Sequence, residues 1–205
     1  METRRNKINK KALEIFLSRL EKPDFYNINL EQYPTDADTA STLLIEAYMD
    51  GNIAGKNVID LGTGNGIFAI GASYLGAKVS TGIDIDPEMV AISRKNAENA
   101  ASYAEFENVN VSDVKGEYDT VLMNPPFGSV IKHDDMPFIN KAIEIGTHIY
   151  SIHNIKSYEY IREFYSQRIQ IIRQERIFIK VPRIYAHHTD IYHEIESVLV
   201  YGIKN

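Results

Sequence analysis

Residues 57–66, NVIDLGTGNG, decide the fold of this chain. The first four residues read as a short apolar strand, and a helical pattern begins at Ile67, directly after the last glycine. The glycines allow a tight turn and a close approach of the backbone to a ligand. A dinucleotide fingerprint needs its third glycine three residues after the second, and this loop lacks that spacing. Asp60 leads into the loop and favours a ligand with cationic and amino groups, so S-adenosylmethionine fits better than NAD.

Strand and helix patterns alternate around this loop, which predicts βαβ winding of a parallel sheet. Two long β-type runs near the end lack room for a helix between them and predict an antiparallel closing hairpin. Residues 128–137 are expected to form a loop. The expected strands cover residues 57–60, 78–85, 106–111, 119–123, 148–153, 169–181 and 191–203, and the expected helices cover 7–20, 38–49, 67–75, 88–101, 138–145 and 157–166.

Length and composition set the class of protein. With 205 residues and 44% hydrophobic content, the chain is long enough for one well-buried core. We expect a single domain over 1–205, with a helical extension over 1–50 and a Rossmann-like core over 51–205. The absence of cysteine excludes disulfides, thiolate zinc sites and cysteine nucleophiles. No apolar run is long enough for a membrane span, and the basic start does not fit a signal peptide. We therefore expect a cytoplasmic protein without a membrane partner.

The charge pattern bears on nucleic-acid binding. A formal net charge of -6 argues against non-specific binding by the whole surface. Two basic blocks, residues 1–11 and 162–183, are candidate phosphate-facing patches, although each also fits the solvated face of a helix or strand. No metal-ligand motif joins the six histidines, so we expect no metal site.

Acidic residues at successive strand ends extend the expected cofactor site. Asp84 follows the glycine loop by about twenty residues, where a carboxylate can accept hydrogen bonds from both ribose hydroxyls. Ile85 is then expected against one face of the adenine ring. Asp113 can accept the exocyclic amine of adenine, and the Val114 amide can reach a ring nitrogen. Each aspartate alone fits a cap or a loop, but their order along the chain favours a cofactor site.

Asn124-Pro125-Pro126-Phe127 follows an apolar strand, and open α/β sheets bind ligands at such strand ends. The Asn124 side-chain oxygen and the Pro125 carbonyl can accept both hydrogens of one planar amino group, while Phe127 stacks on the ring that carries it. These four residues are the expected catalytic residues. Without the glycine loop, an ordinary turn at the prolines and a core position for Phe127 would explain the same sequence.

Several stretches together match one known pattern, and they are Glu31-Gln32-Tyr33-Pro34-Thr35, Gly82-Ile83-Asp84-Ile85-Asp86, Asn124-Pro125-Pro126-Phe127-Gly128, Asp135-Met136 and Tyr150-Ser151-Ile152-His153. They resemble the class I S-adenosylmethionine-dependent methyltransferases, and specifically the small-subunit rRNA adenine-N6 methyltransferases of archaea and eukaryotes. The resemblance implies a seven-stranded, mostly parallel sheet in the order 3-2-1-4-5-7-6 with helices on both faces. The expected cofactor-binding residues are Gln32, Tyr33, Thr35, Asp60, Gly62, Gly64, Asn65, Ile67, Asp84, Ile85, Asp113, Val114 and Asn124.

The resemblance implies an enzyme that makes N6-methyladenosine in RNA, with ribosomal RNA as the expected substrate. It also implies a small zinc-binding activator protein, docked by β-augmentation on the edge strand at 106–111. Two other functions stay open. A protein glutamine N5-methyltransferase of the release-factor type offers a similar planar amide, although such enzymes usually carry Tyr where Phe127 stands. A cofactor-binding ribosome-assembly factor without turnover is the second. DNA adenine methylation is disfavoured by the lack of an evident target-recognition domain.

Overall fold

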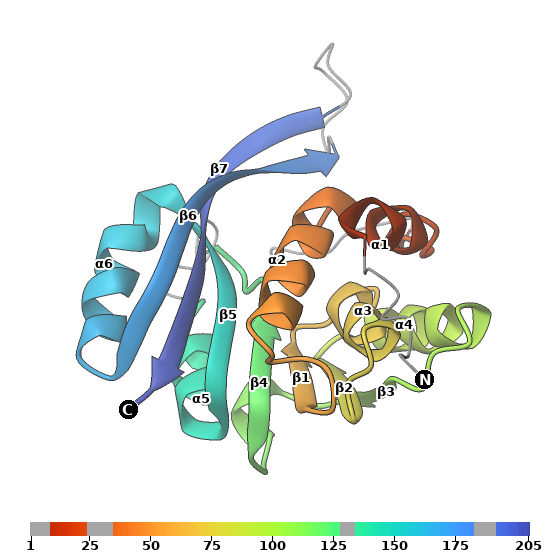
Figure 1. Cartoon of the computed structure of the whole chain (residues 1–205), viewed down its shortest axis with the longest axis horizontal. Helices are drawn as coiled ribbons and strands as arrows, with labels where there is room; N and C mark the ends of the chain where they lie inside the picture. The colour runs from red at the N-terminus through yellow and green to blue at the C-terminus, as the bar shows by residue number, and fades with distance from the viewer. Residues whose placement is uncertain (1–8, 24–34, 128–133, 183–191) are drawn as a thin grey trace, which may run out of the picture.

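The computed structural model describes residues 9–23, 35–127, 134–182 and 192–205. These residues form one seven-stranded sheet in the order β3-β2-β1-β4-β5-β7-β6 (Figure 1). Strands β1 to β5 pair in parallel, and β7 runs antiparallel to both β5 and β6. The predicted strand order and closing hairpin are therefore confirmed. The strands are β1 (Asn57–Leu61), β2 (Val79–Asp84), β3 (Glu105–Asn108), β4 (Tyr118–Met123), β5 (Gly146–Asn154), β6 (Ile169–Pro182) and β7 (Tyr192–Lys204).

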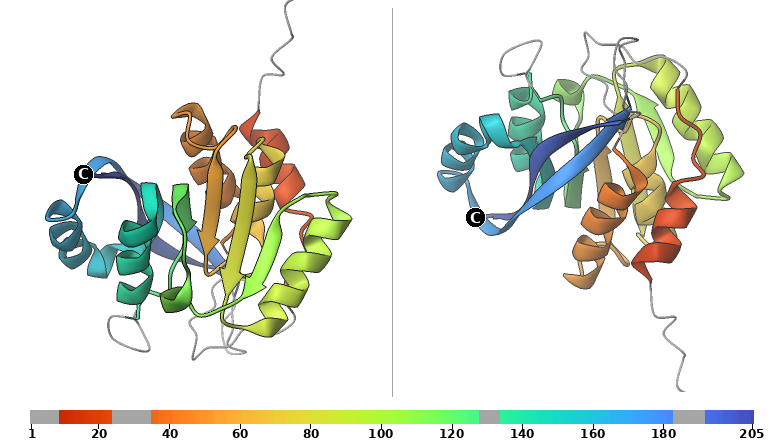
Figure 2. Two further views of the ribbon diagram at one scale, coloured as in Figure 1. Left: turned by 90° about the horizontal axis from the view of Figure 1, so that it is seen from below. Right: turned by 90° about the horizontal axis from the view of Figure 1, so that it is seen from above.

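Helices cover both faces of the sheet (Figure 2). Because side chains alternate along a strand, neighbouring strand residues enter different cores. Val58 and Leu122 lie in an apolar cluster with residues of α1 to α4, whereas Ile59 and Val121 lie in a second cluster with residues of α5 and α6. The helices are α1 (Lys10–Leu17), α2 (Ala37–Met49), α3 (Ile67–Tyr74), α4 (Pro87–Asn99), α5 (Met136–Ile145) and α6 (Ile155–Ser166).

The two N-terminal helices pack into the same core as α3. Leu13 and Leu17 of α1 and Leu44 of α2 are fully or almost fully buried in the first cluster. Gly71 of α3 lies so close to Leu44 that a Cβ atom at position 71 would overlap the leucine side chain. The N-terminal helices therefore share one buried core with α3. Within the described part of the chain, no helix is both long and apolar enough to cross a bilayer.

Several element boundaries differ from the prediction by up to three residues, and those of β3 and α5 matter most for the carboxyl ends of the strands. β3 ends at Asn108, three residues earlier than expected, because the chain turns into a short 3-10 helix, η2 (Val111–Asp113), whose cap Asn110 accepts a hydrogen bond from the Ser112 amide. Helix α5 begins at Met136, inside the predicted loop 128–137. A proline in the first turn of a helix is well tolerated, so Pro137 does not delay the helix.

The edge strand β3 is shorter and more polar than expected. Phe106 is 5% exposed, so its ring is part of the core and not of the surface. Glu105 and Glu107 on either side of it are exposed. Arg94 of α4 donates a hydrogen bond to the Phe106 carbonyl at 2.6 Å. Short length, flanking charges and a bonded carbonyl are ways in which proteins limit pairing at a sheet edge.

The fold places two expected sites at the same level of the sheet. Leu61 of β1 lies opposite Met123 of β4, so Gly62 and Asn124 are the next residues on neighbouring strands. The strand order reverses between β1 and β4. Open α/β sheets bind their ligands outside the carboxyl ends of the strands at such a switch point.

Candidate active site

The glycine loop after β1 depends on left-handed backbone conformations. Gly62, Gly64 and Gly66 have φ angles of +74°, +54° and +88°. L side chains rarely adopt such angles, which explains glycine at all three positions. The Gly62 and Thr63 amides both donate to the Ile83 carbonyl of β2, at 2.9 and 2.8 Å. The loop is therefore held against the neighbouring strand, and Gly66 leads directly into α3.

A cavity of about 290 Å³ opens at this loop and at the end of β4. Its volume is near the lower end of the range for small-molecule sites. It contains most of the predicted cofactor residues that the structure describes. Its lining consists of Pro23, Thr35, Gly62, Thr63, Gly64, Asn65, Ile67, Phe68, Ile83, Asp84, Ile85, Met89, Asn110, Val111, Ser112, Asn124, Pro126, Asp134, Pro137 and Phe138.

Asp84 at the end of β2 presents a fixed carboxylate to this cavity. Its Oδ2 accepts a hydrogen bond from the Gly64 amide at 2.9 Å, and its Oδ1 accepts one from the Asp86 amide at 3.0 Å. Burial raises the pKa of Asp84, while the hydrogen bonds from these two amides oppose the rise. The next residue, Ile85, is 51% exposed and lines the cavity. A fixed acceptor beside an exposed apolar side chain fits a ribose and the attached adenine.

Asp60 lies beneath the loop and is not part of the cavity lining. It is 1% exposed, and its Oδ2 accepts hydrogen bonds from Thr63 Oγ1 at 2.6 Å and from the Ala69 amide at 3.2 Å. Burial raises its pKa to about 7. Asp60 thus joins the loop to the first turn of α3. Its effect on a bound cofactor is indirect, because it positions the glycine loop and does not line the cavity.

A second set of contacts fastens the chain before Pro23 onto the glycine loop. Asn96 of α4 is buried, and its amide donates to the Asn65 carbonyl at 2.9 Å and to the Glu21 carbonyl at 3.0 Å. Its Oδ1 accepts from the Glu21 amide at 2.8 Å. Asn65 Nδ2 also donates to the Glu21 carbonyl, at 3.1 Å. These bonds hold Pro23 at the cavity, a contribution that the sequence pattern did not indicate.

Asn124 lines the cavity and carries an unpaired acceptor. Its Nδ2 donates a hydrogen bond to Thr35 Oγ1 at 2.9 Å. Its Oδ1 is buried and has no hydrogen-bond partner among the described residues. An unpaired buried acceptor normally costs free energy of about 1–3 kcal/mol. Unpaired polar groups in a ligand pocket are therefore candidates for contact with a ligand.

The other three residues of the expected catalytic motif differ in their placement. Pro126 lines the cavity, whereas Pro125 is buried and does not. Phe127 is 9% exposed and belongs to the apolar cluster of α1 to α4. The structure thus brings Asn124 and Pro126 to the cavity and packs the Phe127 ring into the core. Stacking of Phe127 on an acceptor stays a prediction.

The residues expected at the adenine edge lie beside the cavity. Asp113 is exposed, and Val114 is buried with its carbonyl accepting a hydrogen bond from Lys141 Nζ at 3.0 Å. Neither lines the cavity, whereas Asn110 and Ser112 of the same segment do. The early end of β3 accounts for this shift, because the chain reaches the cavity before it reaches Asp113. Gln32 and Tyr33 lie outside the described residues.

Phe138 is a cavity residue that the sequence analysis missed. Its ring lies over the glycine loop, since a Cβ atom at Gly62 would be 3.0 Å from Phe138 Cε1. The missed signal is Pro137, which is typical of the first turn of a helix and indicates that α5 starts before the predicted residue 138. The close approach is a second reason for glycine at position 62.

The histidine of the 150–153 motif is a buried structural residue. His153 Nε2 lies 2.8 Å from Ser151 Oγ and 3.2 Å from the Tyr165 hydroxyl. Burial lowers the pKa of His153 to about 3, so its ring is neutral near pH 7. Across the described segments, no group of three or more His, Cys, Asp or Glu side chains is arranged to hold a metal ion.

Comparison with known proteins identifies the family. The family model described as ribosomal protein L11 methyltransferase (PrmA) matches residues 36–171. The rRNA N(6)-adenosine-methyltransferase METTL5 of Danio rerio is 36% identical, with 75% of this chain and 78% of that protein aligned. A crystal structure titled as a candidate RNA methyltransferase of Pyrococcus horikoshii is 35% identical, with a TM-score of 0.88 and coverage of 100% of this chain and 99% of that one.

A more distant structure shares the fold alone. Magnesium protoporphyrin IX methyltransferase of Synechocystis, crystallised with bound S-adenosylmethionine, is 18% identical, has a TM-score of 0.65, and covers 99% of this chain and 100% of its own. The glycine loop, the Asp84 carboxylate and the exposed Ile85 fit the same cofactor. The chain therefore belongs to the class I S-adenosylmethionine-dependent methyltransferases, and within this class it matches both the ribosomal protein L11 methyltransferase (PrmA) family model and the rRNA N(6)-adenosine-methyltransferases.

Proposed function

We propose that this methyltransferase modifies the exocyclic N6 amine of adenosine in RNA, with small-subunit ribosomal RNA as its substrate. The observation that carries the proposal is the buried Oδ1 of Asn124, a residue of the cavity lining, and this oxygen has no hydrogen-bond partner among the described residues. A planar amino group carries two hydrogens and needs acceptors for them. Asn124 Oδ1 supplies one acceptor in the proposed site, and the Pro125 carbonyl supplies the other, which requires that this carbonyl become accessible from the cavity, since Pro125 is not part of its lining.

These acceptors address the main chemical difficulty of the reaction. The N6 lone pair is delocalised into the adenine ring, which makes the amine a poor nucleophile. Two acceptors that hold the N6 hydrogens favour the geometry in which the lone pair is localised on nitrogen. S-adenosylmethionine would supply an electrophilic methyl group on a positively charged sulfur: the bond from N6 to the methyl carbon would form as the sulfur–methyl bond breaks, the sulfur would leave as a neutral thioether, and the surplus N6 proton would pass to solvent. Position and oriented dipoles, without a strong base, then account for most of the rate enhancement.

The target base has to leave any helix before it can reach Asn124, so the proposal includes base flipping. Phe127 holds the flipped base by stacking in this proposal, a contact worth about 1–3 kcal/mol in other nucleic-acid sites. For this contact the Phe127 ring has to turn out of the apolar cluster in which it lies.

The relatives and the surface charge both bear on whether RNA is the substrate. The aligned relative named above acts, by its name, on adenosine in rRNA. Within the basic block 162–183, however, several arginines already form ion pairs: Arg162 with Glu159 at 2.7 Å, Arg173 with Asp50 at 2.7 Å, and Arg176 with Glu196 at 2.9 Å. The support for RNA therefore comes from the relatives more than from this block.

The activator protein belongs to the same proposal. We place it on β3, which is the free edge of the sheet on the side of the glycine loop. A shallow surface hollow lies along this edge, lined by Arg94, Ala97, Glu98, Ser102, Ala104, Glu105, Phe106 and Glu107. A partner strand could pair with β3 by β-augmentation if it displaces the hydrogen bond from Arg94 to the Phe106 carbonyl. We expect low solubility or low activity of the enzyme alone, and a monodisperse, fully active monomer would contradict the need for an activator.

A protein glutamine N5-methyltransferase is the alternative that geometry permits. Glutamine also presents a planar NH₂ group. The match to a ribosomal protein methyltransferase family is compatible with a protein as the methyl acceptor. Membership of a methyltransferase family counts against the third possibility, a ribosome-assembly factor without turnover.

One experiment separates these functions. Purified enzyme is incubated with S-adenosylmethionine labelled in the methyl group, and with either small-subunit rRNA or a peptide-chain release factor. We expect label in the RNA, released by nuclease digestion as N6-methyladenosine. Label on glutamine of the release factor would support the alternative, and cofactor binding without transfer to either would support the assembly factor. Mapping of methyladenosine in rRNA from cells with and without the gene then locates the nucleotide.

A further inference from the structure

The acceptor site works only if the Asn124 amide has one of its two orientations. An asparagine side chain carries an acceptor oxygen and a donor NH₂ group of nearly the same shape. With Oδ1 toward the substrate, the side chain accepts a hydrogen from a planar amine. With Nδ2 toward the substrate, two sets of donors would face each other. Some neighbouring group therefore has to distinguish the two ends of the amide.

Thr35 is placed to make this distinction. Its Oγ1 accepts the hydrogen bond from Asn124 Nδ2 at 2.9 Å. Thr35 is 8% exposed, and both residues line the cavity. The Thr35 hydroxyl accepts through a lone pair, so its own hydrogen remains available for a second contact in the cavity. That second contact is compatible with the cofactor role expected for Thr35.

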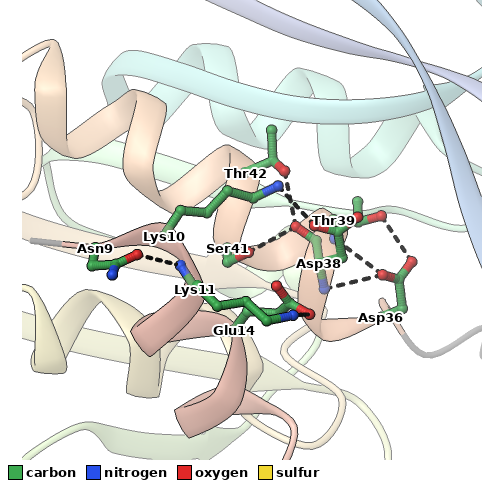
Figure 3. A network of polar contacts seen from close by, with 9 residues as sticks. All are labelled: Asn9, Lys10, Lys11, Glu14, Asp36, Asp38, Thr39, Ser41 and Thr42. Carbon is green, nitrogen blue, oxygen red and sulfur yellow. Dashed lines mark hydrogen bonds and ion pairs between the residues drawn. The ribbon is translucent and has the colours of Figure 1, made fainter.

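The backbone beside Thr35 is fixed by the N-cap of α2 (Figure 3). Asp36 Oδ1 accepts hydrogen bonds from the Asp38 and Thr39 amides at 3.1 and 3.0 Å, and Oδ2 accepts one from Thr39 Oγ1 at 2.8 Å. Asp36 Oδ2 also accepts a hydrogen bond from the Lys180 amide of β6 at 3.2 Å. The helix cap, which directly follows Thr35, is thus tied to the closing hairpin.

Contacts from α1 add to this support. Lys10 Nζ lies 2.7 Å from Asp38 Oδ1, so the start of α1 is joined to the first turn of α2 (Figure 3). Lys10 and Asp38 are both well exposed, and such a pair contributes little free energy on its own. The cap at Asp36 is therefore the main restraint on Thr35.

We infer that Thr35 is a positioning residue, whose hydroxyl holds the Asn124 amide with Oδ1 toward the acceptor amine. The inference rests on the proposed function and adds to it the group that orients the catalytic amide. Thr35 acts through Asn124 and does not itself need to touch the acceptor.

The test uses Thr35→Val, which keeps the shape of the side chain and removes the hydroxyl, and Thr35→Ser, which keeps the hydroxyl. Methyl transfer to RNA is measured at saturating cofactor, in the wild-type and Asn124→Ala backgrounds. We expect Thr35→Val to lower kcat about 10-fold or more, with the KM for RNA within about 3-fold, and Thr35→Ser to restore kcat to within about 3-fold of wild type. In the Asn124→Ala background, Thr35→Val should change kcat less than about 2-fold.

A matched control comes from the same helix. The Thr42 hydroxyl bonds to the Asp38 carbonyl at 2.9 Å, and Thr42 does not line the cavity. Thr42→Val makes the same chemical change and should leave kcat unchanged. An undiminished kcat in Thr35→Val, or a loss that multiplies with that of Asn124→Ala, would overturn the inference.

A second readout does not depend on the acceptor. The side-chain NH₂ signal of Asn124, assigned by its loss in Asn124→Ala, is followed by ¹⁵N NMR. In the wild type we expect one hydrogen-bonded amide proton that exchanges slowly, and in Thr35→Val we expect faster exchange and a changed shift. No change in this signal would overturn the inference. If the signal changes as expected but RNA is not methylated, the proposed substrate is wrong and the role of Thr35 stands.

Discussion

The ends of β1 and β2 and the end of β4 meet at one cavity but present different chemistry to it. On the β1–β2 side, glycines with positive φ hold the loop, and both Asp84 carboxylate oxygens already accept backbone hydrogen bonds. On the β4 side, the Asn124 amide is held at one end by Thr35, and its oxygen has no partner within the described residues. The preformed glycine loop and the Asp84 carboxylate suit cofactor binding. An unpaired acceptor suits contact with a group whose bonding changes during the reaction. We therefore expect substitutions on the two sides to affect different measurements.

The largest expected effect comes from a substitution in the glycine loop after β1. Gly66→Val places a β-branched residue at a φ of +88°, with its Cβ 3.0 Å from Phe106 Cζ and 3.1 Å from Ser93 Cβ. We expect unfolding free energy to fall by about 2–5 kcal/mol, from backbone strain and overpacking together. Urea denaturation measures this change.

The control for this substitution is Gly55→Val. Gly55 has a φ of +73° and open space around a Cβ atom. It should show the strain cost alone, about 1–3 kcal/mol. Equal losses in the two variants would mean that close packing beneath the loop does not matter.

The next largest effect is expected on the affinity for the cofactor alone. Asp84→Ala removes the carboxylate that accepts from the Gly64 amide and faces the cavity. Loss of hydrogen bonds to a charged group should raise the cofactor Kd by about 10–100-fold, as measured by isothermal titration calorimetry. Asp86→Ala is the control, because Asp86 caps α4 and does not line the cavity. Similar Kd changes in both variants would refute a specific role for Asp84.

The two sides also differ in the pH dependence of stability. The pKa of Asp60 rises from 3.8 to about 7 on burial, so the native state keeps a proton that the unfolded chain releases. Its contribution to stability is full below pH 4 and is lost as pH rises toward 7, by up to about 1.4 kcal/mol per pH unit. Asp60→Asn should remove this loss. Stability curves of wild type and variant that remain parallel from pH 4 to pH 8 would contradict the shift.

The pKa shift of His153, which lies on β5, has the opposite sign. Burial lowers its pKa from 6.5 to about 3, so the unfolded chain binds a proton that the native state does not. Its contribution is full above pH 6.5 and is lost as pH falls toward 3. The Asp60 and His153 slopes oppose each other between pH 4 and pH 6.5 in the wild type, so His153→Gln should leave a curve in which stability falls as pH rises, read by thermal denaturation from pH 7 to pH 4. An unchanged curve in His153→Gln would contradict the shift.

Much of the fold follows from local pattern, because alternating apolar strands and helices admit few topologies. The glycine loop, Asp84 and Asn124 were predicted because each fills a fixed place at a strand end. Phe127 shows the limit of this reasoning. An aromatic residue after two prolines can face a ligand or the core, and only tertiary packing placed it in the core.

Boundaries and long-range contacts were the hardest to predict. The early end of β3 moved Asn110 and Ser112 into the cavity in place of Asp113 and Val114. Asn96, which joins Glu21 to the glycine loop, carries no sequence signal because its partners lie 31 and 75 residues away. Phe138 was missed for a related reason, since its contact with Gly62 depends on where α5 begins.

The most direct test compares cofactor Kd and the single-turnover rate of methyl transfer in Asn124→Ala. The cavity keeps its loop and the Asp84 carboxylate in this variant, so we expect cofactor Kd within about 3-fold of wild type. Loss of one preorganised hydrogen-bonding group at the reacting centre should lower the transfer rate by about 10²–10³-fold. Undiminished transfer by Asn124→Ala would contradict the assignment of the Asn124 oxygen as the acceptor of the amine hydrogen.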